Sequence, residues 1–182
     1  RFMRQLAVPD AMHIHFNGAG GNIGAGKYND GSHENRLILA ERLAAGMKKA
    51  YDTSTKAALS QSAVNWRTET VSLPVDSVKD AELDSKVLKR FRISETFDIG
   101  CLSLGNARIL FMPGELFVEY QLAAKAMRPD LYVAMAAYGD YSPGYIPTAE
   151  AFKTGGYEVS VSRLLPECEN ILMTAMNKLL AK

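Results

Sequence analysis

The most conspicuous candidate for chemistry is a glycine-rich loop at residues 18–27. Residues 21–27 have the spacing of a phosphate-binding P-loop up to Lys27, but Tyr28 stands where that motif needs a Ser or Thr hydroxyl for magnesium. Gly20, Gly24 and Gly26 also match a looser dinucleotide-binding spacing. The turn at residues 29–31 interrupts the chain where a helix should present its amides to phosphate. Nucleotide binding is therefore an alternative, and a glycine-rich turn that brings backbone close to another site is favoured.

Two histidines precede this loop. His13 and His15 alternate along a predicted strand at residues 12–17, so both imidazoles would point to one face, a geometry that suits metal chelation. No third ligand is in view, and the favoured interpretation is a pair of partly buried histidines that form hydrogen bonds beneath the loop. His33 lies beside a predicted helix cap and is interpreted as a surface or capping residue.

Glu115 and a group of tyrosines are the other candidates. Glu115 follows Pro113-Gly114 at the end of a predicted strand, where α/β domains place functional groups, although a carboxylate there is equally an ordinary partner of a helix dipole. Segments 138–147 and 155–158 are rich in tyrosine and glycine, and they follow the next predicted strand. We expect them to converge on the same sheet edge, where tyrosines could pack a lid, stack on a substrate or bind a metal.

Two predicted strands and one helix position these residues. Segments 97–104 and 107–112 are rich in β-forming residues, and Gly105-Asn106 between them is a typical two-residue hairpin turn. A helix with one apolar face is predicted from Glu115 to residue 127, followed by a buried strand at 131–138. This strand-helix-strand unit predicts an α/β fold, a mixed sheet with flanking helices.

Further elements are predicted on both sides of that unit. Ser32 is a plausible N-cap for a helix, and residues 164–179 form a final amphipathic helix. Segment 53–92 is less regular and predicts a strand at 68–73 and a short charged helix at 78–88. The apolar face of the helix after Ser32 comprises Ala40, Leu43, Ala44, Met47 and Tyr51.

Composition is that of a globular protein. Of the 182 residues, 47% are hydrophobic and 23% charged, with 21 Lys plus Arg against 20 Asp plus Glu and a formal charge of +1. This balance provides no overall field for nucleic acid or an anionic membrane, and no apolar stretch is long enough to cross a bilayer. Cys101 and Cys168 lie on apolar faces and are interpreted as small hydrophobes.

The sequence begins Arg-Phe-Met-Arg, without an initiator methionine. We therefore expect residues 1–182 to be a single partial domain, the C-terminal part of a larger layered domain whose remainder lies upstream. Any export signal would also lie upstream.

Three motifs occur in an order that resembles the catalytic domain of the neutral/alkaline non-lysosomal ceramidases, which are zinc amidases that hydrolyse the N-acyl bond of ceramide. They are residues 20–25 (Gly-Gly-Asn-Ile-Gly-Ala), residues 112–115 (Met-Pro-Gly-Glu) and the block 138–158. The likeness spans most of the chain, although the middle region matches only in general pattern. It implies a small-molecule or lipid-like substrate and, by resemblance, export to the periplasm or the cell exterior.

The resemblance assigns roles to particular residues. It implies that Glu115 and Tyr145 are zinc ligands and that Tyr157 donates a hydrogen bond to charge developing on the reacting carbonyl. Asn22 and Gly24 are the predicted catalytic positions of the loop that carries the family's nucleophilic serine, but Gly24 stands at the serine position itself. A serine route is then unavailable, although zinc could still activate water directly.

The family's remaining zinc ligands are two histidines far upstream of this loop, and His13 and His15 lie too close to the loop to be their counterparts. We therefore expect the isolated chain to be inactive and a zinc-dependent hydrolase to need the upstream residues. A non-catalytic relative that binds a lipid or a glycan is the second hypothesis, and nucleotide binding the third.

Overall fold

The chain forms two compact units, one made of Arg1–His15 with Gly24–Ala58 and the other of Phe16–Ile23 with Leu59–Lys182. The two units are described separately here. The structure, a computed structural model, describes residues 2–24, 26, 30–56, 58–60, 63–79, 81, 96–139 and 143–181.

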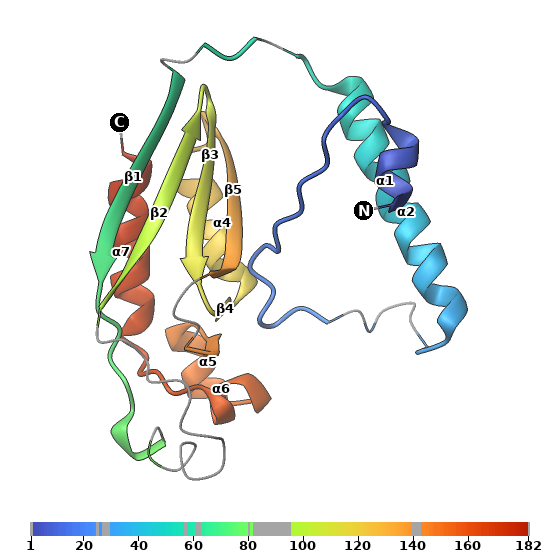
Figure 1. Ribbon diagram of the computed structural model, residues 1–182. Coiled ribbons are helices and arrows are strands. Elements are labelled where there is room, and N and C mark those ends of the chain that lie inside the picture. The colour runs from blue at the N-terminus through green and yellow to red at the C-terminus, as the bar shows by residue number, and fades with distance from the viewer. Residues whose placement is uncertain are drawn as a thin grey trace. The chain divides into compact units, whose positions relative to one another are not determined.

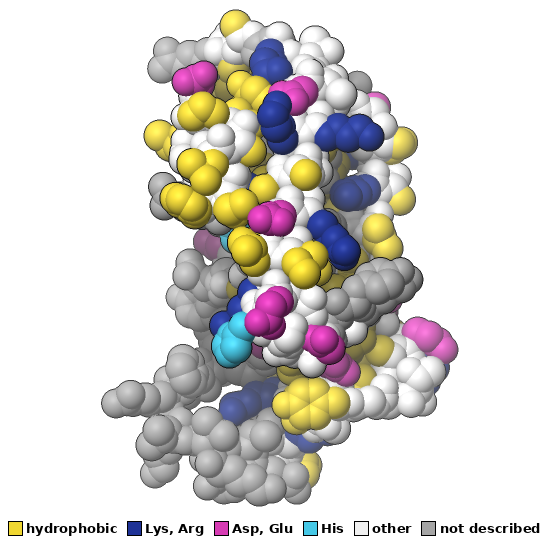
Figure 2. Space-filling model, turned by 90° about the vertical axis from the view of Figure 1, so that its right-hand side faces the viewer, with side chains coloured by type: hydrophobic (Ala, Val, Ile, Leu, Met, Phe, Trp, Pro, Cys, Tyr) yellow, Lys and Arg dark blue, Asp and Glu magenta, His cyan; other side chains and the backbone are white. Residues whose placement is uncertain are grey.

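The first unit consists of helix α1 (Phe2–Ala7) and helix α2 (His33–Thr53) (Figure 1). Helix α2 confirms the helix predicted after Ser32, whose N–H donates to Oδ1 of Asp30 at 2.9 Å. Of the predicted apolar face only Ala44 is buried, because the six-residue α1 is too short to cover a helix of 21 residues. Hydrophobic side chains accordingly lie at the surface between Lys and Arg side chains (Figure 2).

The strand predicted at residues 12–17 is wrong. This segment has no strand pairing and passes from the first unit to the second. Its alternating apolar residues Met12, Ile14 and Phe16 are 86%, 66% and 49% exposed, so no buried face selects a pleated conformation. The segment reaches the sheet at its end, where the carbonyl of Asn17 accepts from the N–H of Ala137 at 2.8 Å.

The second unit is built on a four-stranded sheet in the order β1-β2-β3-β5. Strand pairs β1/β2 and β2/β3 are antiparallel and β3/β5 is parallel, which confirms the predicted hairpin and the mixed α/β fold. The strand predicted at 68–73 starts earlier because all of β1 pairs with β2. The strands are β1 (Val64–Val71), β2 (Phe97–Leu104), β3 (Ala107–Pro113) and β5 (Tyr132–Gly139).

Helices α4 (Val118–Met127) and α7 (Cys168–Leu180) cover one face of this sheet (Figure 1). Helix α4 connects the parallel strands β3 and β5, as predicted for a strand-helix-strand unit. The core lies between the helices and the sheet and includes Tyr120, Leu110 and Met176, each no more than 1% exposed. Both cysteines are free and buried, as expected for small hydrophobes.

Several predicted boundaries are corrected. The helix predicted from Glu115 begins at Val118, because Glu115–Leu116 forms the short strand β4, which pairs with β6 (Tyr145–Ile146). The last helix begins at Cys168 and not at Leu164, because Leu164 forms an isolated β-bridge with Val75.

Two short helices follow β6: α5 (Ala149–Thr154) and α6 (Tyr157–Val161). Residues 78, 79 and 81 of the helix predicted at 78–88 are helical, and the rest of that prediction lies outside the described residues. No helix of the described part of the chain has the length and apolarity needed to cross a membrane.

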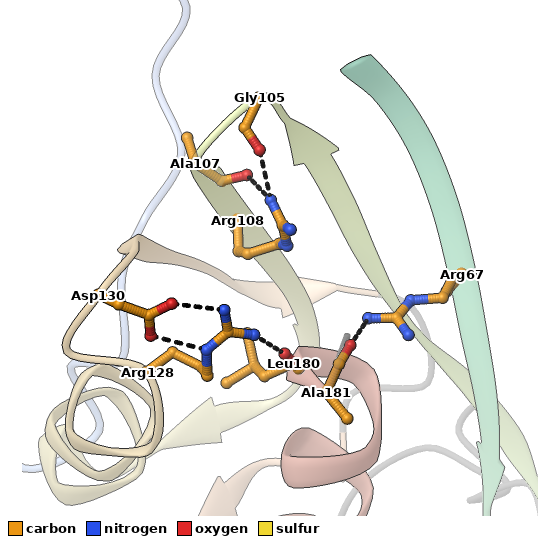
Figure 3. Close-up of polar contacts among 8 residues, drawn as sticks. All are labelled: Arg67, Gly105, Ala107, Arg108, Arg128, Asp130, Leu180 and Ala181. Atoms are coloured by element: carbon orange, nitrogen blue, oxygen red, sulfur yellow. Dashed lines mark hydrogen bonds and ion pairs between the residues drawn. The ribbon is translucent and has the colours of Figure 1, made fainter. Parts of the chain in front are cut away.

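Three arginines surround the C-terminal end of α7 (Figure 3): Arg67 from β1, Arg108 from β3 and Arg128 at the end of α4. Arg67 donates to the main-chain carbonyls of Leu179 and Ala181, the latter at 2.6 Å. These carbonyls have no partner within the helix, and cations are favourable at the negative end of a helix dipole.

Arg128 and Arg108 form further bonds at this end of the sheet (Figure 3). Arg128 donates to the carbonyl of Leu180 at 2.5 Å and forms a bidentate pair with Asp130 at 2.8 and 2.7 Å. Arg108 donates to the carbonyl of Gly105 at 2.9 Å. Arg67 and Arg128 thus tie the end of α7 to β1 and to the end of α4, whereas Arg108 bonds within the turn between β2 and β3.

Candidate functional site

A two-strand ladder brings Glu115 and Tyr145 together. Strands β4 and β6 run parallel with Glu115 opposite Tyr145 and Leu116 opposite Ile146, and the N–H of Glu115 donates to the carbonyl of Gly144 at 2.8 Å. Leu116 and Ile146 are fully buried. Since side chains alternate along a strand, Glu115 and Tyr145 both point away from that core, with their side chains on the same face.

The backbone before Glu115 requires a glycine at position 114. Its φ of +52° is in the left-handed region, and a Cβ would lie 2.6 Å from the carbonyl oxygen of Gly144. The carbonyl of Gly114 also accepts from the N–H of Tyr138 at 3.0 Å. One tight turn therefore joins the ends of β3 and β5 to the strand that carries Glu115.

Tyr145 lies close enough to Glu115 for the charge of the carboxylate to act on the phenol. The pKa of Tyr145 is raised, chiefly by the negative charge of Glu115, with smaller contributions from desolvation and from neighbours that include Tyr157 and Glu158. The Tyr145 and Tyr157 rings are 6.1 Å apart and nearly perpendicular. The structure thus brings Glu115, Tyr145 and Tyr157 together, with Glu158 of the candidate segment 155–158 as a neighbour for which no individual role was predicted.

Tyr138 belongs to the tyrosine-rich segment 138–147, but no individual role was predicted for it. Its φ of +61° makes it the one non-glycine residue with positive φ in the described part of the chain. Burial and then the charge of Glu115 raise the pKa of its phenol, and its hydroxyl would lie 3.8 Å from a Cβ at Gly20. An aromatic residue in this conformation carries backbone strain, and a sequence pattern cannot predict such strain.

The glycine-rich loop docks directly against the Glu115 strand. A Cβ at Gly21 would overlap the main-chain carbonyl of Glu115, and the N–H of Gly21 donates to the carbonyl of Leu116 at 2.8 Å. This is the close backbone approach expected for a glycine turn. The amides of Ala19 and Ile23 are also bonded within the protein, to Gln121 Oε1 and to the carbonyl of Gly20 respectively.

Asn22 has a structural task at the start of α4. Its Oδ1 accepts from the N–H of Val118 at 2.8 Å, and its Nδ2 donates to Oε2 of Glu119 at 2.9 Å. The side chain therefore caps a helix distant in sequence, since the N-cap residue Phe117 makes no side-chain cap bond. The catalytic role that the resemblance implied for Asn22 remains a prediction.

Gly24 belongs to the first unit, directly after Ile23 of the second. It is exposed, and a Cβ there would meet nothing within 4 Å. The space at this position would therefore accept a serine. Lys27 and Tyr28, on which the comparison with a P-loop rested, lie outside the described residues.

The donor atoms at the site are one carboxylate and a phenol beside it. Within the described residues no group of three or more His, Cys, Asp or Glu could hold a metal, and Nε2 of His13 bonds instead to the carbonyl of Val8 at 2.9 Å. Zinc in proteins takes oxygen, nitrogen and sulfur ligands and usually has at least three from the protein. Glu115 and Tyr145 fit as part of such a set, which needs further ligands.

Comparison with known proteins identifies the fold class, a mixed α/β domain that resembles part of a solved neutral ceramidase. No family model matches the chain, and no curated protein matches it. The neutral ceramidase from Pseudomonas aeruginosa is 13% identical with a TM-score of 0.56, over 89% of this chain and 36% of that one. A ceramidase complexed with C2 is 18% identical with a TM-score of 0.41, over 46% of this chain and 14% of that one.

At 13% identity the similarity to the neutral ceramidase shows the fold alone, in agreement with the fold implied by the resemblance noted in the sequence. The chain spans 36% of the length of the neutral ceramidase it matches.

Proposed function

We propose that this chain is the C-terminal part of the catalytic domain of a ceramidase-like, zinc-dependent hydrolase that acts on an amide or a related bond. The observation that carries the proposal is the pairing of Glu115 with Tyr145 across β4 and β6. A carboxylate and a phenol on adjacent strands are two hard oxygen donors held by the main chain, and residues outside this chain would supply the remaining ligands.

Zinc bound there would polarise the scissile carbonyl and lower the pKa of a bound water. Tyr157 would donate a hydrogen bond to the carbonyl oxygen as negative charge develops on it, and its 67% exposure and its contact with the Tyr145 ring support this role. Asn22 holds the glycine loop against α4. Gly24 provides no side-chain nucleophile, so attack by water is the proposed route.

A lipid-like amide is the proposed class of substrate. The support is the resemblance of the three motifs and the shared fold with a solved neutral ceramidase. Hydrolysis in the full-length protein should be measured with a series of N-acyl amides of different chain lengths, with and without a chelator.

We expect turnover that the chelator abolishes and added zinc restores. Glu115→Ala should lose it by about two orders of magnitude or more, and Tyr157→Phe by about tenfold to a hundredfold, since one hydrogen-bond donor to a developing oxyanion is removed. Glu150→Ala is the matched control, because Glu150 forms an exposed ion pair with Lys153 in α5. Turnover that survives the chelator would contradict the zinc proposal.

A second candidate is a non-catalytic relative that keeps the fold to bind a lipid or a glycan. Gly24 at the serine position favours it. Chelator-sensitive turnover of any amide would exclude this candidate.

Nucleotide binding by the loop is the third candidate and has less support, because the amides of Ala19, Gly21 and Ile23 already have protein acceptors. Calorimetric titrations with ATP and with NAD that show no binding heat would exclude nucleotide binding.

A further inference from the structure

The sheet of the second unit carries a hollow on the face opposite α4 and α7, apart from the Glu115 site. Two aromatic rings form its walls: those of Trp66 and Phe111 are 5.2 Å apart and inclined at 60°. Phe16 packs edge-on against Phe111 at 5.8 Å. The hollow has a volume of about 310 Å³ and is lined by Trp66, Thr68, Asp98, Ile99, Gly100, Phe111, Met112, Pro113 and Gly139.

Gly100 allows the indole to lie where it does. A Cβ at Gly100 would overlap the six-membered ring of Trp66, so only glycine lets the ring rest on strand β2. The indole is nevertheless 51% exposed. One edge of the ring is therefore held by the strand while much of its surface stays open to a ligand.

Asp98 gives the hollow its charge. Among the described residues of the lining it is the one ionisable side chain, and none of them is Lys or Arg. Oδ1 of Asp98 accepts from the hydroxyl of Thr70 at 2.6 Å, and this bond fixes the carboxylate at the rim. A single negative charge beside open aromatic rings is complementary to a positive charge.

The apolar walls restrict which cation can bind. A small inorganic cation would have to exchange its water shell for ring carbons and methyl groups, which is unfavourable. An alkylated ammonium carries apolar substituents that can contact Trp66 and Phe111, and its diffuse charge interacts with the electron-rich face of a ring. A sugar ring fits less well, because Thr68 and Asp98 and the indole N–H are the polar side-chain groups of the lining.

We propose that this hollow binds a quaternary or alkylated ammonium group, with its methyl groups against Trp66 and Phe111 and its charge opposite Asp98. The proposal is independent of zinc and of hydrolysis, because none of Glu115, Tyr145 and Tyr157 lines the hollow.

Trp66 is a wall of the site, so binding to the full-length protein can be followed by calorimetry and by the emission of Trp66, taken as the signal that a Trp66→Phe variant lacks. Choline and tetramethylammonium are titrated at constant ionic strength while Trp66 emission is recorded, and calorimetry is used to confirm the affinity. The matched neutral probe is 3,3-dimethyl-1-butanol, which has the shape of choline without its charge, and glucose is the saccharide probe. We expect saturable changes with both cations and at least tenfold weaker binding of the neutral probe.

Asp98→Asn tests the charge without changing the shape of the hollow. We expect it to weaken choline binding about tenfold, while Asp52→Asn, which alters an exposed ion pair of α2, leaves binding unchanged. Gly100→Ala should displace the indole and abolish the response. Because Gly100→Ala can also disturb folding, the Asp98→Asn result decides.

Equal affinity for choline and its neutral analogue, or an Asp98→Asn variant that binds choline as the wild type does, would overturn the proposal. Saturation by glucose without saturation by choline would overturn it in favour of a saccharide site.

Discussion

The two ends of strand β3 hold polar residues in opposite ways. At its start, the guanidinium groups of Arg67 and Arg128 are bonded to carbonyls at the end of α7, and Arg128 also pairs with Asp130 (Figure 3). Beyond its end, main-chain bonds hold Glu115 and Tyr145, and their side chains have no hydrogen bond to any other described residue. The arginine side chains form structural bonds and stabilise the fold. The side chains of Glu115 and Tyr145, which are positioned by the main chain, stay available to a ligand.

Replacing Gly21 by alanine should have the largest effect. The new Cβ would overlap the carbonyl of Glu115, which cannot move without breaking the pairing of β4 with β6. We expect the free energy of unfolding to fall by about 3 kcal/mol. Chemical denaturation measures the loss. Gly24→Ala is the control and should change stability by less than about 0.5 kcal/mol, because its Cβ meets no neighbour within 4 Å.

Equal stability of the Gly21→Ala and Gly24→Ala proteins would show that the loop does not dock on the Glu115 strand. The proposed difference between the two ends of β3 would then lack its support at the Glu115 end.

Alkaline pH should weaken the start of α7. Burial raises the pKa of the Cys168 thiol from its ordinary value of 9.0 to about 11, so the folded protein keeps the proton where the unfolded chain has lost it. The contribution is fully present below pH 9 and is lost as the pH rises toward 11, by the order of 2 kcal/mol.

Urea denaturation at a series of pH values measures this slope. Cys168→Ala should reduce the slope between pH 9 and 11, although the buried Tyr120 phenol, whose pKa is also raised from its ordinary value of 10.0, adds a decline of its own above pH 10. A slope unchanged by Cys168→Ala would contradict the assignment.

Arg128→Lys tests the arginine end. Lysine cannot reproduce the bidentate pair with Asp130 together with the bond to Leu180, and we expect a measurable loss of stability, smaller than that of Gly21→Ala. Thermal denaturation measures the loss. Zinc content and amide turnover of the full-length protein should be unchanged by this substitution. If Arg128→Lys lost zinc and kept its stability, the arginine end of β3 would serve the ligand site and the proposed difference between the two ends of β3 would be wrong.

Asn22→Ala should have the smallest effect, about 1 kcal/mol of stability, because it removes the cap from the first turn of α4. The matched control is Asn35→Ala, which removes a bond to Asp30 in the first unit. If Asn22→Ala abolishes turnover without changing stability, Asn22 acts in catalysis and its cap bond is incidental.

Local patterns predicted the sheet and its hairpin, because the Gly105-Asn106 turn and the β-rich runs specify neighbouring strands. The same reasoning failed at residues 12–17, where alternating apolar residues have no core to face. It also missed β4 and β6, because two-residue strands that pair across about thirty residues have no detectable period. The cap on α4 by Asn22 and the backbone of Tyr138 depend on tertiary contacts, which a local pattern does not contain.

The central claim is that Glu115 and Tyr145 bind one zinc ion together. The most direct measurement is zinc per protein, by mass spectrometry, in the full-length protein and its Glu115→Gln and Tyr145→Phe variants. Tyr132→Phe is the control, because Tyr132 is an exposed tyrosine at the opposite end of β5. We predict that the wild type and the control hold zinc and that both site variants lose it. Wild-type zinc content in both site variants would contradict the claim.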